Sequence, residues 1–401
     1  MTLTRRIALK QAAAFGVAAL AAPSLSRARA ADRWIIRGSL PLTGPFAEIG
    51  LDGLKSTQDW VEMKNAAGGI AGRRIDISFE DSGYNPKTAL SNFKRTMAAE
   101  VRPHFYFGDS TGFMTLVRPE LARTPVLSGG ASFANELADP KANPCQFISG
   151  PSYDAMAEIA MRYIAGNGGR RVAVVYSDTA FGRDPLAHAR AAAADLGLEI
   201  VIELATKLQG VDAAGYAAKL DRAGVDHVFI HGYVAGVWPE ILAEARALGV
   251  DAQFVGTFWS MDLKTIRAKQ DRYGGAMDGY AGVMPYRYLY EAADHPAYRE
   301  IVAFREAKYG RAVSDHITAW SLQELATFAI LEKIFLDVVA ADLEPTPQNL
   351  AQAIGRIRNW DSGGYFGLPA TMATHSINQA RICQYDAATR LFVQVTPTIR
   401  V

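Results

Sequence analysis

Short runs rich in β-branched and aromatic residues alternate along this chain with stretches whose apolar residues recur at helical spacing. In the first part of the chain the pattern predicts strands over 34–40, 74–79, 104–107 and 125–128. Between them it predicts helices over 51–65, 86–100 and 113–123. This alternation is typical of βαβ units on a parallel sheet, because a parallel connection needs a crossover of helix length. It therefore predicts an α/β fold.

The same alternation begins again after Pro151. Strands are predicted over 171–176, 199–204, 227–231 and 253–255. Helices are predicted over 153–165, 184–196, 213–223 and 237–248. Gly197, Gly224 and Gly249 mark the ends of three of these helices. The 401 residues therefore hold two consecutive α/β modules, each long enough for its own core.

The last third of the chain departs from this pattern. An aromatic and apolar run over 279–290 is followed by helices predicted over 296–309, 314–337 and 345–357, and by a β-like end over 380–395. Two modules with a returning tail predict lobes joined by more than one crossover. Such a hinge permits closure around a ligand.

The N-terminus is typical of an export signal. Residues 4–10 resemble the twin-arginine pattern, with Ala8 where phenylalanine is usual, and an alanine-rich segment follows over 11–25. Ala28 and Ala30 are the small residues that a signal peptidase reads, which predicts cleavage after Ala30 and a periplasmic location. The alternative is an amphipathic first helix. The processing site has no cysteine, so a lipid anchor is not indicated.

Charge and cysteine content exclude several classes of protein. A net charge of +1 leaves no basic footprint for nucleic acid. In an oxidising compartment the two cysteines, Cys145 and Cys383, are able to form a disulfide, and two separate buried thiols are the alternative. Neither cysteine has a cysteine or histidine at ligand spacing, so no metal site is expected.

A set of loop motifs, taken in order, resembles one family. The motifs lie at 42–45 (LTGP), 65–72 (NAAGGIAG), 80–81 (ED), 85–86 (NP), 108–111 (GDST), 177–182 (SDTAFG) and 231–233 (HGY). Together they resemble the branched-chain amino-acid-binding (Leu/Ile/Val-binding) type of periplasmic solute-binding protein. The resemblance covers the chain after the signal.

The resemblance implies a type I periplasmic binding protein fold, with two doubly wound lobes joined by three crossover strands. Lobe one is then expected over 31–149 and 283–362, and lobe two over 150–282 and, with the hinge, 363–401, after a signal peptide over 1–30. It also implies a monomeric substrate-binding component of an ABC importer, with a small-molecule ligand, a membrane permease as partner and no cofactor. A ligand-sensing partner of a membrane receptor is an open alternative.

The resemblance also implies a set of contact residues in the cleft. Ser110 and Thr111 match the loop that holds a ligand carboxylate, where a hydroxyl and outward-pointing N–H groups suit an anion. The alternative is that one of them only caps the helix near Phe113. The second contact loop supplies Ala131, Ser132 and Phe133, and lobe two supplies Phe181 and Tyr233.

One position departs from the family's amino-acid binders. They carry a carboxylate for the ligand ammonium where this chain has Phe258, and burying an ammonium without a counter-charge is costly. Phe258, Trp259 and the other aromatic residues predict apolar walls and an aromatic or apolar carboxylate ligand. Open alternatives are an amino acid, a quaternary amine held by cation–π contacts, and core packing of Phe258 and Trp259. Arg287 is either a carboxylate contact or a hinge residue.

The common nucleotide-binding and metalloprotease motifs are absent from the sequence. No GxGxxG follows the first strand, and the chain contains no GxxxxGK[ST] or HExxH. His231 stands alone at a strand end, where it is either a ligand contact or a hydrogen-bonded structural group. Without an acid–base pair beside a nucleophile, no catalytic role is expected.

Overall fold

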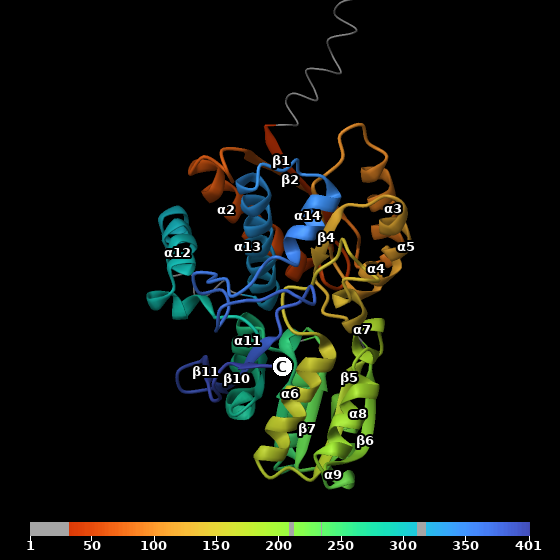
Figure 1. Ribbon diagram of the computed structural model, residues 1–401. Coiled ribbons are helices and arrows are strands. Elements are labelled where there is room, and N and C mark those ends of the chain that lie inside the picture. The colour runs from red at the N-terminus through yellow and green to blue at the C-terminus, as the bar shows by residue number, and fades with distance from the viewer. Residues whose placement is uncertain (1–31, 208–211, 234, 311–317) are drawn as a thin grey trace, which may run out of the picture.

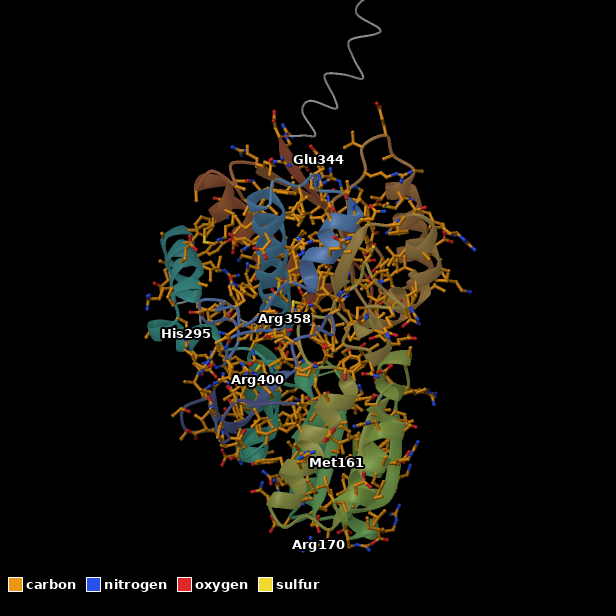
Figure 2. All side chains as sticks on the ribbon, viewed as in Figure 1. Met161, Arg170, His295, Glu344, Arg358 and Arg400 are labelled. Atoms are coloured by element: carbon orange, nitrogen blue, oxygen red, sulfur yellow. The ribbon has the colours of Figure 1, made fainter. Side chains whose placement is uncertain are left out.

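Two α/β lobes are stacked end to end in the computed structural model, which describes residues 32–207, 212–233, 235–310 and 318–401. Lobe one is the upper and lobe two the lower body in Figure 1. In Figure 2, Glu344 lies at the far end of lobe one and Arg170 at the far end of lobe two, with Arg358 between them. The expected signal peptide over 1–30 lies outside the described residues.

Lobe one is built on a parallel four-stranded sheet in the order β2-β1-β3-β4. The strands are β1 (Arg33–Leu40), β2 (Arg74–Asp81), β3 (Phe105–Gly108) and β4 (Leu127–Gly130). The helices that follow them are α2 (Ala47–Ala66), α3 (Pro86–Met97), α4 (Thr111–Leu116) and α5 (Arg118–Arg123), with the 3₁₀ helix η1 (Asn135–Ala138). Strands β3 and β4 are buried along their whole length, and this burial explains the continuous aromatic run of β3.

Helix starts in lobe one follow capping chemistry. The Asn85 side chain accepts hydrogen bonds from the backbone N–H groups of Lys87 and Thr88, and Pro86 opens helix α3. The single helix expected over 113–123 is two helices that meet at Val117. Pro119 explains the break, because proline has no N–H to continue the α4 ladder and is well suited to the first turn of a new helix.

Lobe two contains an eight-stranded mixed sheet. Its main path runs β11-β10-β9-β8-β7-β5-β6, and β12 pairs with β10. The parallel strands are β5 (Arg171–Ser177), β6 (Glu199–Thr206), β7 (His227–His231), β8 (Gln253–Gly256) and β9 (Ala281–Met284). The antiparallel additions are β10 (Gln379–Asp386), β11 (Leu391–Gln394) and β12 (Ile399–Arg400).

Helices cover both faces of the lobe-two sheet. They are α6 (Tyr153–Gly166), α7 (Ala180–Arg183), α8 (Leu186–Asp195), α9 (Ala213–Ala223), α10 (Trp238–Ala247) and α11 (Leu263–Tyr273), with the 3₁₀ helices η2 (Phe258–Ser260), η3 (Gly274–Met277) and η4 (Leu289–Asp294). The sequence pattern did not predict α11. Only Leu263 and Ile266 of this helix are buried, so its apolar stripe is too short to stand out.

After β9 the chain returns to lobe one as α12 (Pro296–Tyr309), α13 (Ala319–Ala340) and α14 (Pro347–Ile354). Helix α13 lies beside α2 in Figure 1, and its rings stack on lobe-one tryptophans: Phe335 on Trp34 at 3.8 Å and Phe328 on Trp60 at 5.0 Å between centroids. No helix among the described residues is long and apolar enough to cross a membrane.

The chain passes between the lobes three times, and hydrogen bonds join the three passages. Ile148 and Ser149 belong to the first passage, Tyr286 to the second, and Phe366 and His375 to the third. The first and third passages are joined by a hydrogen bond from Ile148 N to His375 O of 2.9 Å. The second and third are joined by an antiparallel bridge between Tyr286 and Phe366. The hydroxyls of Ser149 and Tyr286 lie 3.0 Å apart, which links the first passage to the second. The hinge is therefore a compact hydrogen-bonded unit.

Candidate functional site

The contact loops expected from the sequence all leave the carboxyl ends of parallel strands, where open α/β sheets place their ligands. Ser110 and Thr111 follow β3, and Ala131 to Phe133 follow β4. In lobe two, Phe181 follows β5, Tyr233 follows β7 and Phe258 follows β8. The structure brings these loops together between the lobes, since the Phe133 and Phe258 rings lie 5.6 Å apart.

A chain of polar groups crosses the cleft. The Thr111 hydroxyl lies 2.9 Å from that of Ser132 and 3.4 Å from that of Tyr153, and the Trp259 indole N–H donates to the Tyr153 oxygen at 2.9 Å. Thr111 and Ser132 belong to lobe one, whereas Tyr153 and Trp259 belong to lobe two. All four residues are buried. The site therefore has a neutral, hydroxyl-rich end that is able to donate hydrogen bonds to a ligand oxygen.

Tyr153 was not identified as a site residue from the sequence. Its helix was expected, but its position at the first turn of α6 was interpreted only as a helix start. The backbone N–H of Tyr153 donates to the Phe133 carbonyl at 2.8 Å, so the first passage between the lobes holds the two residues together. The signal that was available is an aromatic residue directly after the capping Ser152.

Ser110 and Thr111 have different roles despite their adjacency. The Ser110 oxygen accepts the backbone N–H of Phe113 at 3.3 Å, as in the capping alternative, while its hydroxyl donates to Asp109 Oδ1 at 3.0 Å. The Ser110 hydroxyl therefore both donates and accepts a hydrogen bond within lobe one. Thr111 is the residue of the pair whose hydroxyl meets the opposite lobe.

Aromatic rings form the walls on both sides of this polar chain. The Phe258 ring contacts those of Phe133, Trp259 and Tyr286 at centroid distances of 5.6, 5.0 and 5.0 Å. Phe181 contacts Tyr153 at 5.1 Å. Phe258 is fully buried among rings from both lobes and the hinge. The core-packing alternative and the wall-lining prediction are therefore both compatible with its position.

Tyr84 and Tyr233 form a second contact between the lobes. Their phenol hydroxyls form a hydrogen bond between the lobes, and the Phe46 ring packs on Tyr84 at 4.3 Å and on Tyr233 at 4.9 Å. Tyr84 has a φ of 60°, a left-handed conformation that is uncommon for a bulky residue and that points to a functional constraint. Burial raises the pKa of both phenols, so both stay neutral. The sequence did not identify Tyr84 or Phe46.

Asp81 explains the turn at 42–45. Its Oδ1 accepts the backbone N–H groups of Leu42 at 2.9 Å and Thr43 at 3.1 Å. Burial opposes ionisation of Asp81, but the hydrogen bond from Thr43 and those from the backbone hold its pKa below the usual value. The ionised carboxylate thereby fixes the turn that presents Phe46 to the cleft.

His231 is a structural group. Its Nε2 donates to the Phe181 carbonyl at 3.0 Å, and its Nδ1 accepts from the Thr257 hydroxyl at 2.8 Å. Burial lowers the pKa of His231 to about 3, so the ring is neutral. With both nitrogens occupied, His231 positions the Phe181 loop and has no free atom for catalysis or for a ligand.

Arg287 belongs to the hinge. Its Nη1 lies 3.4 Å from Glu291 Oε1, and Glu291 also forms an ion pair with the buried Arg381. The Tyr298 hydroxyl donates to the Arg287 carbonyl at 2.7 Å. The hinge alternative for Arg287 thus matches the contacts that its side chain makes.

The two cysteines do not form the disulfide that the sequence left open. Cys145 is a half-buried free thiol in lobe one, and Cys383 is a buried free thiol in β10 of lobe two. Pairing would need them side by side, but they lie in different lobes. Across the parts of the chain that the structure describes, no cluster of histidine, cysteine and carboxylate side chains is arranged to hold a metal ion.

Ionic and capping contacts also join the lobes outside the cleft. Lys264 of α11 lies 2.6 Å from Asp52 and 3.1 Å from Glu48 of α2. The buried Asp262 accepts the backbone N–H of Thr265 at 2.8 Å and that of Ala319 at 2.7 Å, which caps helices in both lobes. The lobes are therefore held in contact beside the site.

The loops at the carboxyl ends of both sheets meet over a compact hinge, an arrangement typical of two-lobed solute-binding proteins. A family model described as "Periplasmic binding protein" matches residues 38–386. The chain belongs to this family of periplasmic binding proteins.

Curated relatives and solved structures agree with this membership. A Leu/Ile/Val-binding protein homolog 7 of Brucella melitensis is 28% identical over 238 residues, which cover 56% of this chain and 57% of that protein, less than two thirds of its length. The structure of a branched-chain amino acid ABC transporter protein from Thermus thermophilus with bound valine has a TM-score of 0.80 at 23% identity, covering 92% of this chain and 96% of that one. It shows that the fold is shared.

A second solved structure has another kind of ligand in the same fold. It is a solute-binding protein of an ABC transporter from Rhodopseudomonas palustris in complex with 3,4-dihydroxybenzoic acid. Its TM-score is 0.75 at 16% identity, covering 92% of this chain and 98% of that chain. The expected two-lobed α/β fold is confirmed by both structures.

Proposed function

We propose that this chain is exported to the periplasm, where it captures a small aromatic or apolar carboxylate between its lobes for an ABC importer. The observation that carries the proposal is the surroundings of Phe258. By the family resemblance, Phe258 matches the position where amino-acid binders have a carboxylate, and the rings of Phe133, Trp259 and Tyr286 surround it. An ammonium placed there would be buried without a counter-charge.

The hydroxyl-rich end of the cleft supports a carboxylate as the polar part of the ligand. Thr111, Ser132 and Tyr153 offer neutral hydroxyls, and a carboxylate accepts hydrogen bonds more strongly than a neutral group does. The flat walls of Phe181 and Phe258 suit an aromatic ring, which stacks edge-to-face or offset on such partners. The Rhodopseudomonas protein with its bound hydroxybenzoic acid is a precedent for this class of ligand in the fold.

Capture follows from closure. The hinge lets the lobes separate, and a ligand that contacts both lobes stabilises the closed arrangement by its differential affinity for that state. Thr111 and Ser132 bind from one side, while Tyr153 and Phe181 enclose the ligand from the other. The closed form is then the state that a membrane permease distinguishes from the open one.

A thermal-shift comparison of residues 31–401 tests the proposal. We expect benzoate to raise the melting temperature, because a ligand that binds only the folded protein stabilises it. Benzyl alcohol, which keeps the ring but lacks the carboxylate, serves as the matched control and should give a much smaller shift. Stabilisation by valine and not by benzoate would show an amino-acid-binding protein in which another group replaces the missing carboxylate.

A further inference from the structure

Asp109 is a buried carboxylate beside the cleft that the proposed capture does not use. It follows β3 directly and is 1% exposed. Its two oxygens accept hydrogen bonds from the hydroxyls of Ser82 and Ser110, the latter at 3.0 Å. Among the described residues, no lysine, arginine or histidine forms an ion pair with it. A buried carboxylate with only neutral partners is costly to keep ionised.

The groups around Asp109 give it no compensating charge. The phenols of Tyr84 and Tyr106 in lobe one and of Tyr233 in lobe two are close enough to interact with it electrostatically, and all three are neutral. The carboxylate of Asp81 repels the Asp109 carboxylate, which further disfavours its ionisation. Burial, as the main cause, raises the pKa of Asp109 to about 6 despite the hydrogen bonds from the two serines.

The position of Asp109 links it to the ligand. Ser110 follows it in the chain and shares a hydrogen bond with it, and the next residue, Thr111, presents its hydroxyl to the cleft. A carboxylate bound by the Thr111 hydroxyl would therefore share this loop with a second, buried carboxylate. Two like charges brought close together in a site of low dielectric constant each disfavour ionisation of the other.

We propose that Asp109 takes up one proton from solvent when the cleft captures a carboxylate ligand, so that capture is coupled to protonation. The ligand and Asp109 enter as two carboxylates, and the complex holds one carboxylate and one neutral carboxylic acid, the added proton coming from the buffer. This inference rests on the proposed function. Under this proposal, the site binds anionic ligands well when Asp109 is protonated, and ionised Asp109 repels them.

The coupling has a definite sign. Below a pH of about 6 Asp109 is already protonated in the free protein, so affinity for the anion is high and nearly constant. Above that pH, binding weakens by up to about tenfold per pH unit until the pKa of Asp109 in the complex is passed. A carboxylate that instead paired with a ligand ammonium would give the opposite result, because binding would then strengthen as the pH rises.

Isothermal titration calorimetry of residues 31–401 with benzoate tests the coupling. At pH 7, the dependence of the binding enthalpy on the ionisation enthalpy of the buffer gives the number of protons exchanged, and we expect an uptake of between about one half and one. Asp109→Asn should abolish both the uptake and the pH dependence above pH 6. The matched control is Asp251→Asn, at an exposed aspartate of lobe two, which should retain both.

The outcomes separate this inference from the proposed function. Benzoate binding without proton uptake, or with proton release, overturns the role of Asp109 and leaves the proposed function in place. If benzoate binds at neither pH 5.5 nor pH 8, the proposed function fails and the coupling fails with it. Should Asp109→Asn not fold, Ser82→Ala provides a second test. Losing that hydrogen bond further disfavours the carboxylate form, so the pH at which affinity begins to fall must rise.

Discussion

The indole N–H of Trp259 donates to the hydroxyl of Tyr153 at 2.9 Å, so two aromatic residues of lobe two form one hydrogen-bonded pair. The Tyr153 hydroxyl lies in turn 3.4 Å from the Thr111 hydroxyl of lobe one. A donor that itself accepts a hydrogen bond is polarised, which strengthens its next bond. Tyr153 is therefore well placed to donate to a ligand carboxylate.

Tyr153→Phe tests this relationship. Removing the hydroxyl deletes one hydrogen bond to the ligand and leaves the Trp259 N–H without its partner, so benzoate affinity should fall by between about threefold and thirtyfold. The measurement is titration calorimetry at pH 6. Tyr163→Phe removes a hydroxyl from the other end of the same helix, α6, and should leave affinity unchanged. Equal affinities for Tyr153→Phe and the unmodified protein would remove Tyr153 from the site.

Phe258→Ala distinguishes a wall of the cleft from ordinary core. Because Phe258 is fully buried, the substitution should lower the free energy of unfolding of the protein by about 3–5 kcal/mol. If the ring lines the site, benzoate affinity should also fall. Phe392→Ala, at a buried ring of β11 away from the loops, should have a similar effect on stability and none on affinity. Equal effects of the two variants on affinity would assign Phe258 to the core alone.

Lys264→Met tests the ionic contact between the lobes. Its ion pairs with Asp52 and Glu48 hold the two lobes in contact, so losing them should lower the affinity for benzoate. Because Lys264 is one-third exposed and water screens these pairs, we expect a fall of only about twofold to fivefold. The loss should disappear at high ionic strength, because salt screens the pair in the unmodified protein as well. Lys269→Met is the control, since Lys269 pairs with Glu240 inside lobe two.

Most strands of the two sheets were predictable because their signal is local, whereas β9 and the short β12 were not predicted as strands. Strands such as β3 and β7 are buried on both faces, so they are continuous apolar runs bounded by polar loops. Helix α11 was missed because it buries only Leu263 and Ile266. The order of the strands and the return of α13 to lobe one depend on long-range packing, which a local pattern does not contain.

The site was predictable only as far as the sheet rule reaches. Loops after parallel strands gather at one edge of a sheet, which agrees with the shared site that the family resemblance implies for Thr111, Phe181 and Phe258. The hydrogen bond between Tyr84 and Tyr233 depends on lobe closure and on the left-handed backbone of Tyr84. No periodicity in the sequence encodes either feature.

The state of the cysteines gives a chemical test of the lobe arrangement. Without reductant, the denatured protein should react with two equivalents of a thiol reagent. The native protein should react slowly at the half-buried Cys145 and not at all at the buried Cys383. Only thiolates react, and burial disfavours the thiolate at both positions. It raises the pKa of Cys145, and it raises the pKa of Cys383 to about 12. Absence of reactive thiols in the denatured protein would show a disulfide and a different placement of the two segments.

Glu324 predicts how the stability of lobe one depends on pH. It is fully buried on α13, where it accepts hydrogen bonds from the Thr57 hydroxyl at 2.9 Å and the Trp320 indole N–H at 2.8 Å. Burial raises the pKa of Glu324 to about 8 in the folded protein, whereas in the unfolded chain it has the ordinary value of a glutamate. The folded state therefore binds a proton that the unfolded chain releases, so the contribution of Glu324 to stability is greatest at acidic pH and declines as the pH rises to about 8.

Denaturant unfolding at pH 5 and pH 8 measures this dependence. Between these values the unmodified protein should lose up to about 4 kcal/mol of unfolding free energy through Glu324, and Glu324→Gln should remove most of that loss because the amide does not ionise. Glu306→Gln, at an exposed glutamate of α12, should keep the dependence of the unmodified protein. If Glu324→Gln and Glu306→Gln lose stability equally from pH 5 to pH 8, then Glu324 is already ionised in the fold, and a cation or water must reach it.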